Sequence, residues 1–271
     1  MADSSATSIE ITDASYGKDE IRVLSRLGTT VRDLTLTLDA EGEFLGSFRS
    51  GDNSAVLPTD TLRRHALAEC GRMPSASAEQ IVDAIALRLL DANPAFTTVT
   101  AEAVGTVWEP AGSGCYRAAA WRPSARVRRT RAGGRQASSG LRGLAVLTTS
   151  GSAFTGFLRD ALTVQEESTD RPLCGSLDAT WTHEDAATVP PDVLADTLLA
   201  ALAGRGSTSI QQLLTAVGTS ALEQHPTLVT VELRFRSEPL SPVPVPEPGV
   251  GTVHDLGAGS IGVTRVALRR A

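Results

Sequence analysis

The sequence predicts an α+β protein made of two successive units, each an antiparallel sheet with helices on one face. Three observations support this fold class. Short segments alternate apolar and polar residues with the period of two that half-buried strands have, and longer segments show the spacing of amphipathic helices. The order of two strands, helices and two strands occurs twice along the 271 residues. The chain is also 41% hydrophobic, which is enough for a substantial core.

The first half starts with a polar leader and a hairpin-like pair of strands. The second strand of this pair, residues 31–38 (VRDLTLTL), alternates strictly. A helix is expected through residues 60–69, with Thr59 and Asp60 where N-cap residues stand. A second helix starts at a capping box, Ser77 with Gln80, and stops before Asn93-Pro94. Two further strands are predicted over residues 97–104 and 117–131, the first rich in β-branched residues.

The clearest break in composition is Gly133-Gly134 followed by Ser138-Ser139-Gly140. We therefore predict a first unit over residues 1–137 and a second over 138–271. In the second half, strands are expected over residues 141–149, 177–182, 228–236 and 262–268, and helices over residues 192–203 and 209–223. The region around Phe154 is predicted to be a short helix or loop, and a proline-rich connection spans residues 239–248. The free edges of such sheets favour pairing with other subunits.

Composition excludes several classes of protein. A net charge of −6 argues against general nucleic-acid binding, although residues 122–135 are locally basic and alternate like a strand. The three cysteines and four histidines show no paired ligand spacing, so neither a disulfide framework nor a metal site is indicated. No apolar run is long enough to cross a membrane, and the first residues lack the pattern of a secretory signal. We expect a cytoplasmic protein that binds neither nucleic acid nor membrane.

One basic residue stands apart from the others. Lysine and arginine together number 25, and Lys18 is the only lysine. An amine can lose its proton when it is desolvated, whereas a guanidinium stays charged, so Lys18 is a candidate general base. The alternative is a surface lysine without a function.

A second candidate site lies between residues 154 and 181. Phe154 offers an aromatic face, and Arg171 offers two parallel donors. A flat polar heterocycle would be bound by such a pair, with the ring stacking on its plane and the guanidinium contacting its edge. The alternatives are a core aromatic and a surface Asp-Arg ion pair.

These residues, with others in the same order, resemble the cofactor-independent urate oxidases of the tunnelling fold. The similar segments are residues 16–19 (YGKD), 51–54 with 59–60 (GDNS, TD), 152–160 (SAFTGFLRD), 169–171 with 178–181 (TDR, DATW) and 209–211 (SIQ). The resemblance covers both halves of the chain. It implies tandem tunnelling-fold units that assemble into an oligomeric barrel, a homotetramer with its sites between subunits.

The resemblance also implies roles for particular residues. Lys18 and Thr59 would form the proton relay, contributed by one subunit. Phe154 would stack on the purine, Arg171 and Gln211 would clamp its edges, and Ile210 would offer its backbone amide, all from the neighbouring subunit. The substrates would be dioxygen and urate or a related oxidised purine, with no flavin, haem or metal cofactor. Without the resemblance, Gln211 reads as an exposed polar residue of its helix.

The sequence departs from the family after the strand that ends near residue 236. The family has Leu-Pro-Asn-Lys-His there, whose asparagine holds dioxygen or water and whose histidine extends the relay. Here the segment is Phe-Arg-Ser-Glu-Pro, so Ser237 replaces the asparagine and Pro239 the histidine. Ser237 can still donate a hydrogen bond, but Pro239 cannot transfer a proton. His254 is a candidate to replace the missing relay histidine.

Two further functions stay open. The chain could be a catalytically impaired uricase paralogue that binds purine or serves as a subunit beside an active paralogue, as Ser237 and Pro239 suggest. A different tunnelling-fold reaction on a pterin-like ring is also conceivable, and the missing metal ligands disfavour it.

Overall fold

The computed structural model describes residues 9–28, 30–184, 189–203, 205–245, 247, 251, 253–255 and 260–271. The chain divides into two compact units. Unit 1 comprises Met1–Ala76, Gln80–Ala103 and Arg126–Gln136, and unit 2 comprises Ser77–Glu79, Val104–Ala125 and Ala137–Ala271. None of the helices within the described ranges has the length and apolar character needed to cross a membrane.

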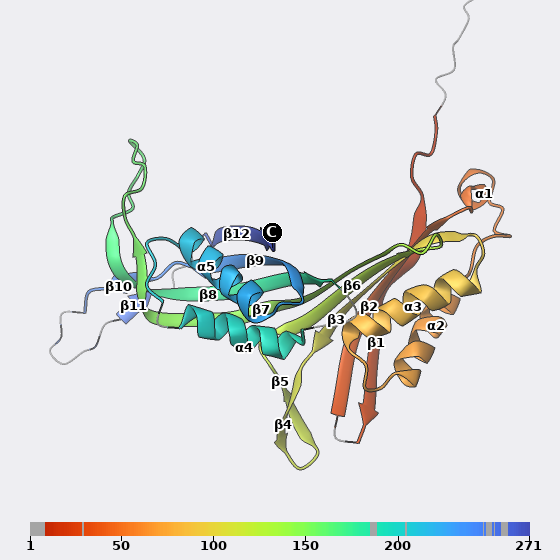
Figure 1. Cartoon of the computed structure of the whole chain (residues 1–271), viewed down its shortest axis with the longest axis horizontal. Coiled ribbons are helices and arrows are strands. Elements are labelled where there is room, and N and C mark those ends of the chain that lie inside the picture. Colours follow the sequence, from red (N-terminus) through yellow and green to blue (C-terminus); the bar gives the residue numbers. More distant parts are fainter. Residues whose placement is uncertain are drawn as a thin grey trace, which may run out of the picture. The chain divides into compact units, whose positions relative to one another are not determined.

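Unit 1 is a sheet with helices against one face (Figure 1). Its strands follow the order β1-β2-β3-β6, and β1 pairs antiparallel with β2. The elements are β1 (Ser15–Leu27), β2 (Thr30–Gly42), α1 (Leu45–Arg49), α2 (Thr59–Arg72), α3 (Ala78–Ala92), β3 (Phe96–Thr106) and β6 (Arg122–Thr130). The last residues of β3 and the first of β6 belong to unit 2.

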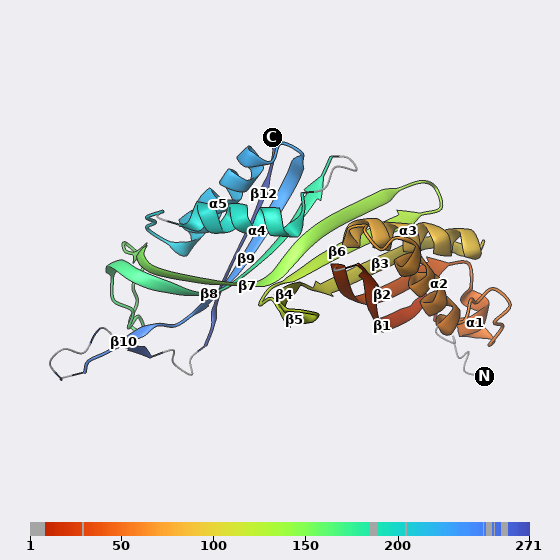
Figure 2. The ribbon, with the colours of Figure 1, turned by 90° about the horizontal axis from the view of Figure 1, so that it is seen from below.

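The alternation in β2 is the physical basis of this packing. The side chains of Leu34, Leu36, Leu38 and Ala40 are buried, and the residues between them are only partly so. Because successive side chains of a strand point to opposite faces, one face of β2 forms core and the other stays open. Figure 2 shows α2 and α3 lying along the same side of the strands of this unit.

Unit 2 repeats this plan with strand order β7-β8-β9-β12, and each strand pairs antiparallel with its neighbours in this order. Helices α4 and α5 cover one face of the sheet (Figure 1). The elements are β7 (Arg135–Phe154), β8 (Ser168–His183), α4 (Pro191–Leu202), α5 (Ile210–Gln224), β9 (Leu228–Glu238) and β12 (Gly262–Arg269). Unit 2 also contains two short antiparallel strand pairs, β4 (Trp108–Gly112) with β5 (Cys115–Ala118), and β10 (Ser241–Val243) with β11 (Val253–Asp255).

The core of unit 2 lies between the sheet and the two helices. Trp181, Leu177 and Phe235 point into it from β8 and β9, and Leu198 and Leu214 point into it from α4 and α5. Each of these five side chains is at most 1% exposed. The predicted α+β class and the repeated order of elements are confirmed.

Several local predictions were wrong. Residues 117–131 do not form one strand, because the chain leaves the ladder at residues 119–121 and splits this segment between β5 and β6. Phe154 is the last residue of β7 rather than part of a helix. The Ser138–Gly140 break lies inside β7, while Gly133, with a φ of 91°, forms the turn before it. Pro58 is the N-cap of α2, and Thr59 is its first residue.

Candidate functional site

In unit 2, Phe154 and Arg171 lie next to each other. Ser152 on β7 pairs with Arg171 on β8, so the guanidinium carbon of Arg171 lies 5.7 Å from the centroid of the Phe154 ring. Both side chains are partly buried. The strand register therefore brings together the aromatic face and the guanidinium that the sequence predicted as a pair. Arg171 thus contacts an aromatic ring, which an Asp-Arg ion pair on the surface would not require.

The start of α5 is tied to the same end of β7. Ser152 forms a parallel bridge with Ser207, the amide of Ala153 donates to the carbonyl of Ser207 at 2.9 Å, and the Ser207 amide donates to the carbonyl of Gly151 at 3.0 Å. Ser152 and Ser207 are both buried. These contacts fix where α5 begins relative to the Phe154 end of the strand.

The first turn of α5 is capped in a way that leaves its leading amides available. Ser209 accepts a hydrogen bond from the Gln212 amide at 3.2 Å, and the Gln212 side chain accepts from Thr208. The amides of Ile210 and Gln211 have no partner earlier in the helix, because first-turn amides lack one. Gln211 is exposed, and Ile210 packs partly against the core of unit 2. A helix start of this kind suits a polar, electron-rich ligand.

A second aromatic residue, which the sequence reasoning missed, supports Phe154. The ring of Phe157 stacks on that of Phe154 with centroids 4.6 Å apart and planes 9° apart. Arg159 covers Phe157 in turn, at 5.1 Å from its centroid. The signal in the sequence was Phe-x-x-Phe with Gly156 between, since the positive φ of Gly156 (69°) lets the chain turn back on itself.

Ser237 and His254 lie on different faces of the sheet of unit 2. Ser237 is two residues after Phe235, which is buried against the helices, and its hydroxyl is 3.5 Å from the carbonyl oxygen of Gly262. His254 on β11 lines a cavity of about 350 Å³ together with Leu147, Thr149, Pro172, Cys174 and Leu240. Pro172 and Cys174 alternate with the buried Leu173, so this cavity opens on the face away from α4 and α5. His254 therefore does not lie on the helix face, where Ser237 and Arg171 are.

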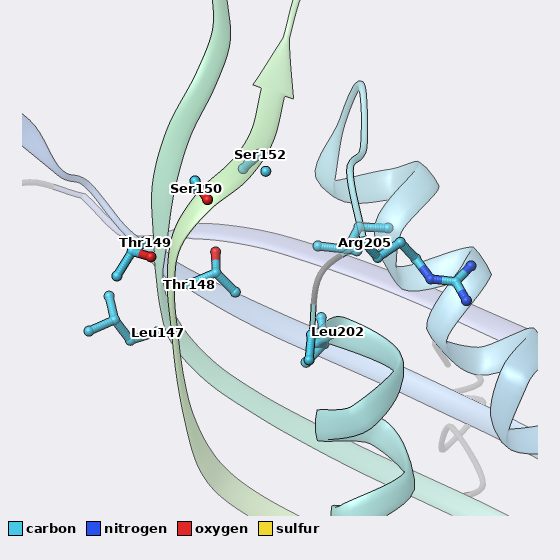
Figure 3. Close-up of a pocket in the computed structure, with 10 residues that line it drawn as sticks. Leu147, Thr148, Thr149, Ser150, Ser152, Leu202 and Arg205 are labelled. Carbon is cyan, nitrogen blue, oxygen red and sulfur yellow. The ribbon is translucent and has the colours of Figure 1, made fainter.

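A second cavity of about 350 Å³ lies between β7 and the end of α4. Figure 3 shows Thr148, Ser150 and Ser152 on the β7 side and Leu202 on the helix side, with the guanidinium of Arg205 extending away from the strand. Hydroxyl groups and leucine side chains make up most of this wall. None of the predicted site residues lines this cavity. Ser152, which does line it, pairs with Arg171 on the neighbouring strand β8.

In unit 1, Lys18 lies on β1 opposite Leu38, and Thr59 is the first residue of α2. Lys18 is partly buried and Thr59 is exposed. The pKa of Asp60 is below its ordinary value, chiefly because Arg64 donates a hydrogen bond to its carboxylate, with smaller contributions from the charges of Arg63 and Lys18. The Lys18 amine is therefore close enough to the start of α2 to act electrostatically on the residue after Thr59.

The start of α2 is attached to β1 by a hydrogen bond. The hydroxyl of Tyr16 accepts from the amide of Leu57 at 2.8 Å, and the Tyr16 ring packs edge-on against Phe44 and Phe96. Burial raises the pKa of Tyr16, so its hydroxyl stays protonated at neutral pH. Within the described ranges, no three His, Cys, Asp or Glu side chains come together in a way that could hold a metal ion.

Comparison with known proteins gives a consistent result. A family model described as Uricase matches residues 137–257. The uricase of Haloferax volcanii is 30% identical over 226 residues, which cover 73% of this chain and 73% of that protein. The uricase of Arthrobacter globiformis is 26% identical over 239 residues, covering 85% of this chain and 79% of that protein.

Solved structures show the same fold. The crystal structure of the Arthrobacter globiformis uricase superposes with a TM-score of 0.87 at 23% identity, covering 97% of this chain and 96% of that one. A urate oxidase from Bacillus sp. TB-90 superposes with a TM-score of 0.84 at 20% identity, covering 95% and 100%.

Proposed function

The chain belongs to the uricase family, and we propose that it oxidises urate or a closely related oxidised purine with dioxygen, without a cofactor. The family makes it an oxidoreductase of the urate oxidase type. The observation that carries the proposal is the contact of Arg171 with the Phe154 ring beside the capped start of α5. A purine stacked on that ring would present its edge to a guanidinium and to the leading helix amides.

The chemistry needs one proton acceptor and one oxidant. Two electrons and two protons leave the purine, and dioxygen takes up both pairs to become hydrogen peroxide. Lys18, with Thr59, would take the first proton, which makes the purine an electron-rich anion that can reduce dioxygen. Phe154, Arg171, Ile210 and Gln211 would hold that anion in place.

These two groups of residues belong to different units of the chain. We propose that copies of the chain assemble as a homotetramer in which one subunit supplies Lys18 and Thr59 and its neighbour supplies the purine clamp. The unpaired edges of β1 and β12, the outermost strands of their units, favour such an assembly, because exposed strand edges tend to pair with another chain.

The direct test is turnover by the purified protein. With urate and dioxygen we expect loss of the urate chromophore together with oxygen uptake. Lys18→Met should abolish turnover while purine binding persists, whereas Arg171→Gln should weaken binding. Arg265→Gln is the matched control, because Arg265 pairs with Glu232 away from the candidate site. Inertness of the wild-type protein toward a panel of oxidised purines would refute an oxidase function.

A second function has its own supporting observation. The Ser237 hydroxyl lies 3.5 Å from the Gly262 carbonyl oxygen, at the limit of hydrogen bonding, and Pro239 has no side-chain donor. These residues favour a purine-binding subunit with impaired turnover, which would work beside an active paralogue. Tight purine binding without oxygen uptake would support it. Activity gained by the double variant Ser237→Asn with Pro239→His would show that only the relay had been lost.

A further inference from the structure

Strand β1 contains an irregularity directly after Lys18. Lys18 pairs with Leu38, but the next regular pair is Ile21 with Leu36, so Asp19 and Glu20 together lie opposite the single residue Thr37. This is a β-bulge, in which one extra residue is inserted into one strand of an antiparallel pair.

The bulge determines which way Lys18 points. Leu36 and Leu38 are both buried on the face that α2 covers, and residues paired across two strands share a face. Lys18 and Ile21 therefore point to the same side. They are three residues apart, so in a regular strand they would point to opposite sides, because side chains alternate. With Ile21 fixed in the core, only the extra residue turns Lys18 toward α2, the helix that begins with Thr59.

The backbone of the bulge is strained and is held by one side chain. Glu20 has a φ of 53°, the only positive φ of a non-glycine residue within the described ranges. Such a conformation is costly for a residue with a β-carbon and needs support from its surroundings. The carboxylate of Asp19 provides this support, since it accepts hydrogen bonds from the Glu20 amide at 2.7 Å and from the Thr37 hydroxyl.

The carboxylate of Asp19 acts on the backbone through its two hydrogen bonds. Its pKa is lowered, first by the Thr37 hydrogen bond and then by that of the Glu20 amide, and Lys18 is not among the groups that shift it. Gly17, on the other side of Lys18, lies so close to the Leu38 carbonyl that a β-carbon would come within 1.8 Å of the oxygen. Lys18 is therefore held between a close backbone approach and the bulge.

We propose that Asp19 is a positioning residue for the reaction, because it stabilises the bulge that turns the Lys18 amine toward the start of α2. This role rests on the proposed function of Lys18 as the base. It requires one carboxylate oxygen of Asp19, Oδ1, which accepts both hydrogen bonds, and not an ion pair with Lys18. Thr37 is its partner on β2.

The test compares matched variants of the full chain. Asp19→Ala removes the oxygen that accepts both hydrogen bonds and should lower kcat about 10- to 100-fold with KM changed less than about twofold, since a small displacement of a catalytic group costs this much. Asp19→Asn keeps one acceptor oxygen and should retain most of the activity. Thr37→Val should lower kcat, and Thr37→Ser, which keeps the hydroxyl, should restore it. Equal loss in Asp19→Asn and Asp19→Ala would contradict a role through the backbone.

A second measurement does not depend on turnover. Because Lys18 is the only lysine, ¹³C-labelled lysine gives a single side-chain NMR signal. We expect this signal to shift in Asp19→Ala and to return to the wild-type position in Asp19→Asn. Deletion of Glu20, which removes the extra residue, should shift it further. An unchanged lysine signal in Asp19→Ala would overturn the proposal.

The two proposals fail in different ways. If Lys18→Met keeps full turnover, Lys18 is not the base and the proposed function is wrong in that point, whatever the NMR signal shows. If Lys18→Met is inactive while Asp19→Ala keeps kcat within about twofold of the wild type, the base is correct and Asp19 does not position it.

Discussion

The hydroxyl of Tyr16 links the strand that carries Lys18 to the segment that carries Thr59. It accepts a hydrogen bond from the Leu57 amide at 2.8 Å, two residues before α2 begins. The substitution Tyr16→Phe removes this oxygen and leaves the ring on Phe44 and Phe96, with which its centroid distances are 4.9 and 5.8 Å. The perturbation therefore removes the hydroxyl with its hydrogen bonds to the Leu57 amide and the Asn93 side chain, and leaves the ring packing in place.

The expected loss of stability follows from the bond to the Leu57 amide. A hydrogen bond contributes about 0.5–1.5 kcal/mol net, and a buried amide left without a partner costs about 1–3 kcal/mol. Leu57 is only partly buried, so water can reach its amide in part, and we expect a loss of about 1.5 kcal/mol. For a chain of this length, 1 kcal/mol corresponds to about 2–4 °C, so Tm should fall by about 3–6 °C. Turnover should fall as well, because the start of α2 loses its attachment to β1.

The assay is thermal unfolding at a fixed protein concentration, since assembly makes Tm depend on concentration. The control is Thr219→Val, which removes an exposed hydroxyl bonded only to the Thr215 carbonyl one turn earlier in α5. Such a local bond contributes little, so the control should stay within about 0.5 kcal/mol of the wild type. The reasoning is refuted if Tyr16→Phe unfolds at the same temperature as Thr219→Val.

Three further outcomes are expected. Burial raises the pKa of Asp83, but the hydrogen bonds and charges of its arginine partners outweigh burial and hold it below 3.8. The ionised Asp83 therefore stabilises the fold above about pH 4, and this contribution is lost as the pH falls through the lowered pKa. In urea unfolding, the free energy of unfolding of Asp83→Asn should reach a lower plateau at neutral pH and fall less steeply in acid than that of the wild type. Phe157→Leu should raise KM for the purine severalfold with kcat less affected, because Phe154 loses the ring stacked on it, and a lower kcat at unchanged KM would contradict this. Gly17→Ala should lower Tm by more than Tyr16→Phe does, since its β-carbon would overlap the Leu38 carbonyl, and a wild-type Tm would show that β1 can shift at no cost.

The sequence predicted most of the regular elements, because burial on one face leaves a simple pattern. Residues 31–38 alternate as β2 requires, and the apolar stripe of Ile81, Ile85 and Leu89 is buried within α3. The misplaced strand over residues 117–131 has a physical reason. The basic run from residue 122 lies along β6, whereas residues 115–118 before it pair with β4 in a separate hairpin, and no local pattern separates the two.

The candidate site was predicted less completely, since it depends on contacts across strands. Phe154 and Arg171 are distant in sequence, and their contact follows from the register of β7 and β8, which no local pattern fixes. The bulge at Asp19 was missed because a register shift appears only when the partner strand is known. Phe157 could have been found from its spacing to Phe154, but the stacking depends on how Gly156 turns the chain.

The structure also bears on how the departure from the family pattern would act. Ser237 pairs with Gly175 on one side and Gly262 on the other, and a β-carbon at Gly262 would come within 2.6 Å of the Ser237 hydroxyl. The glycine at that position lets the Ser237 hydroxyl lie against the backbone of β12. Arg171 reaches Phe154 through the pairing of β7 with β8 and does not depend on Ser237. A change at residue 237 should therefore alter turnover and leave purine affinity nearly unchanged, whereas a change at Arg171 should do the reverse.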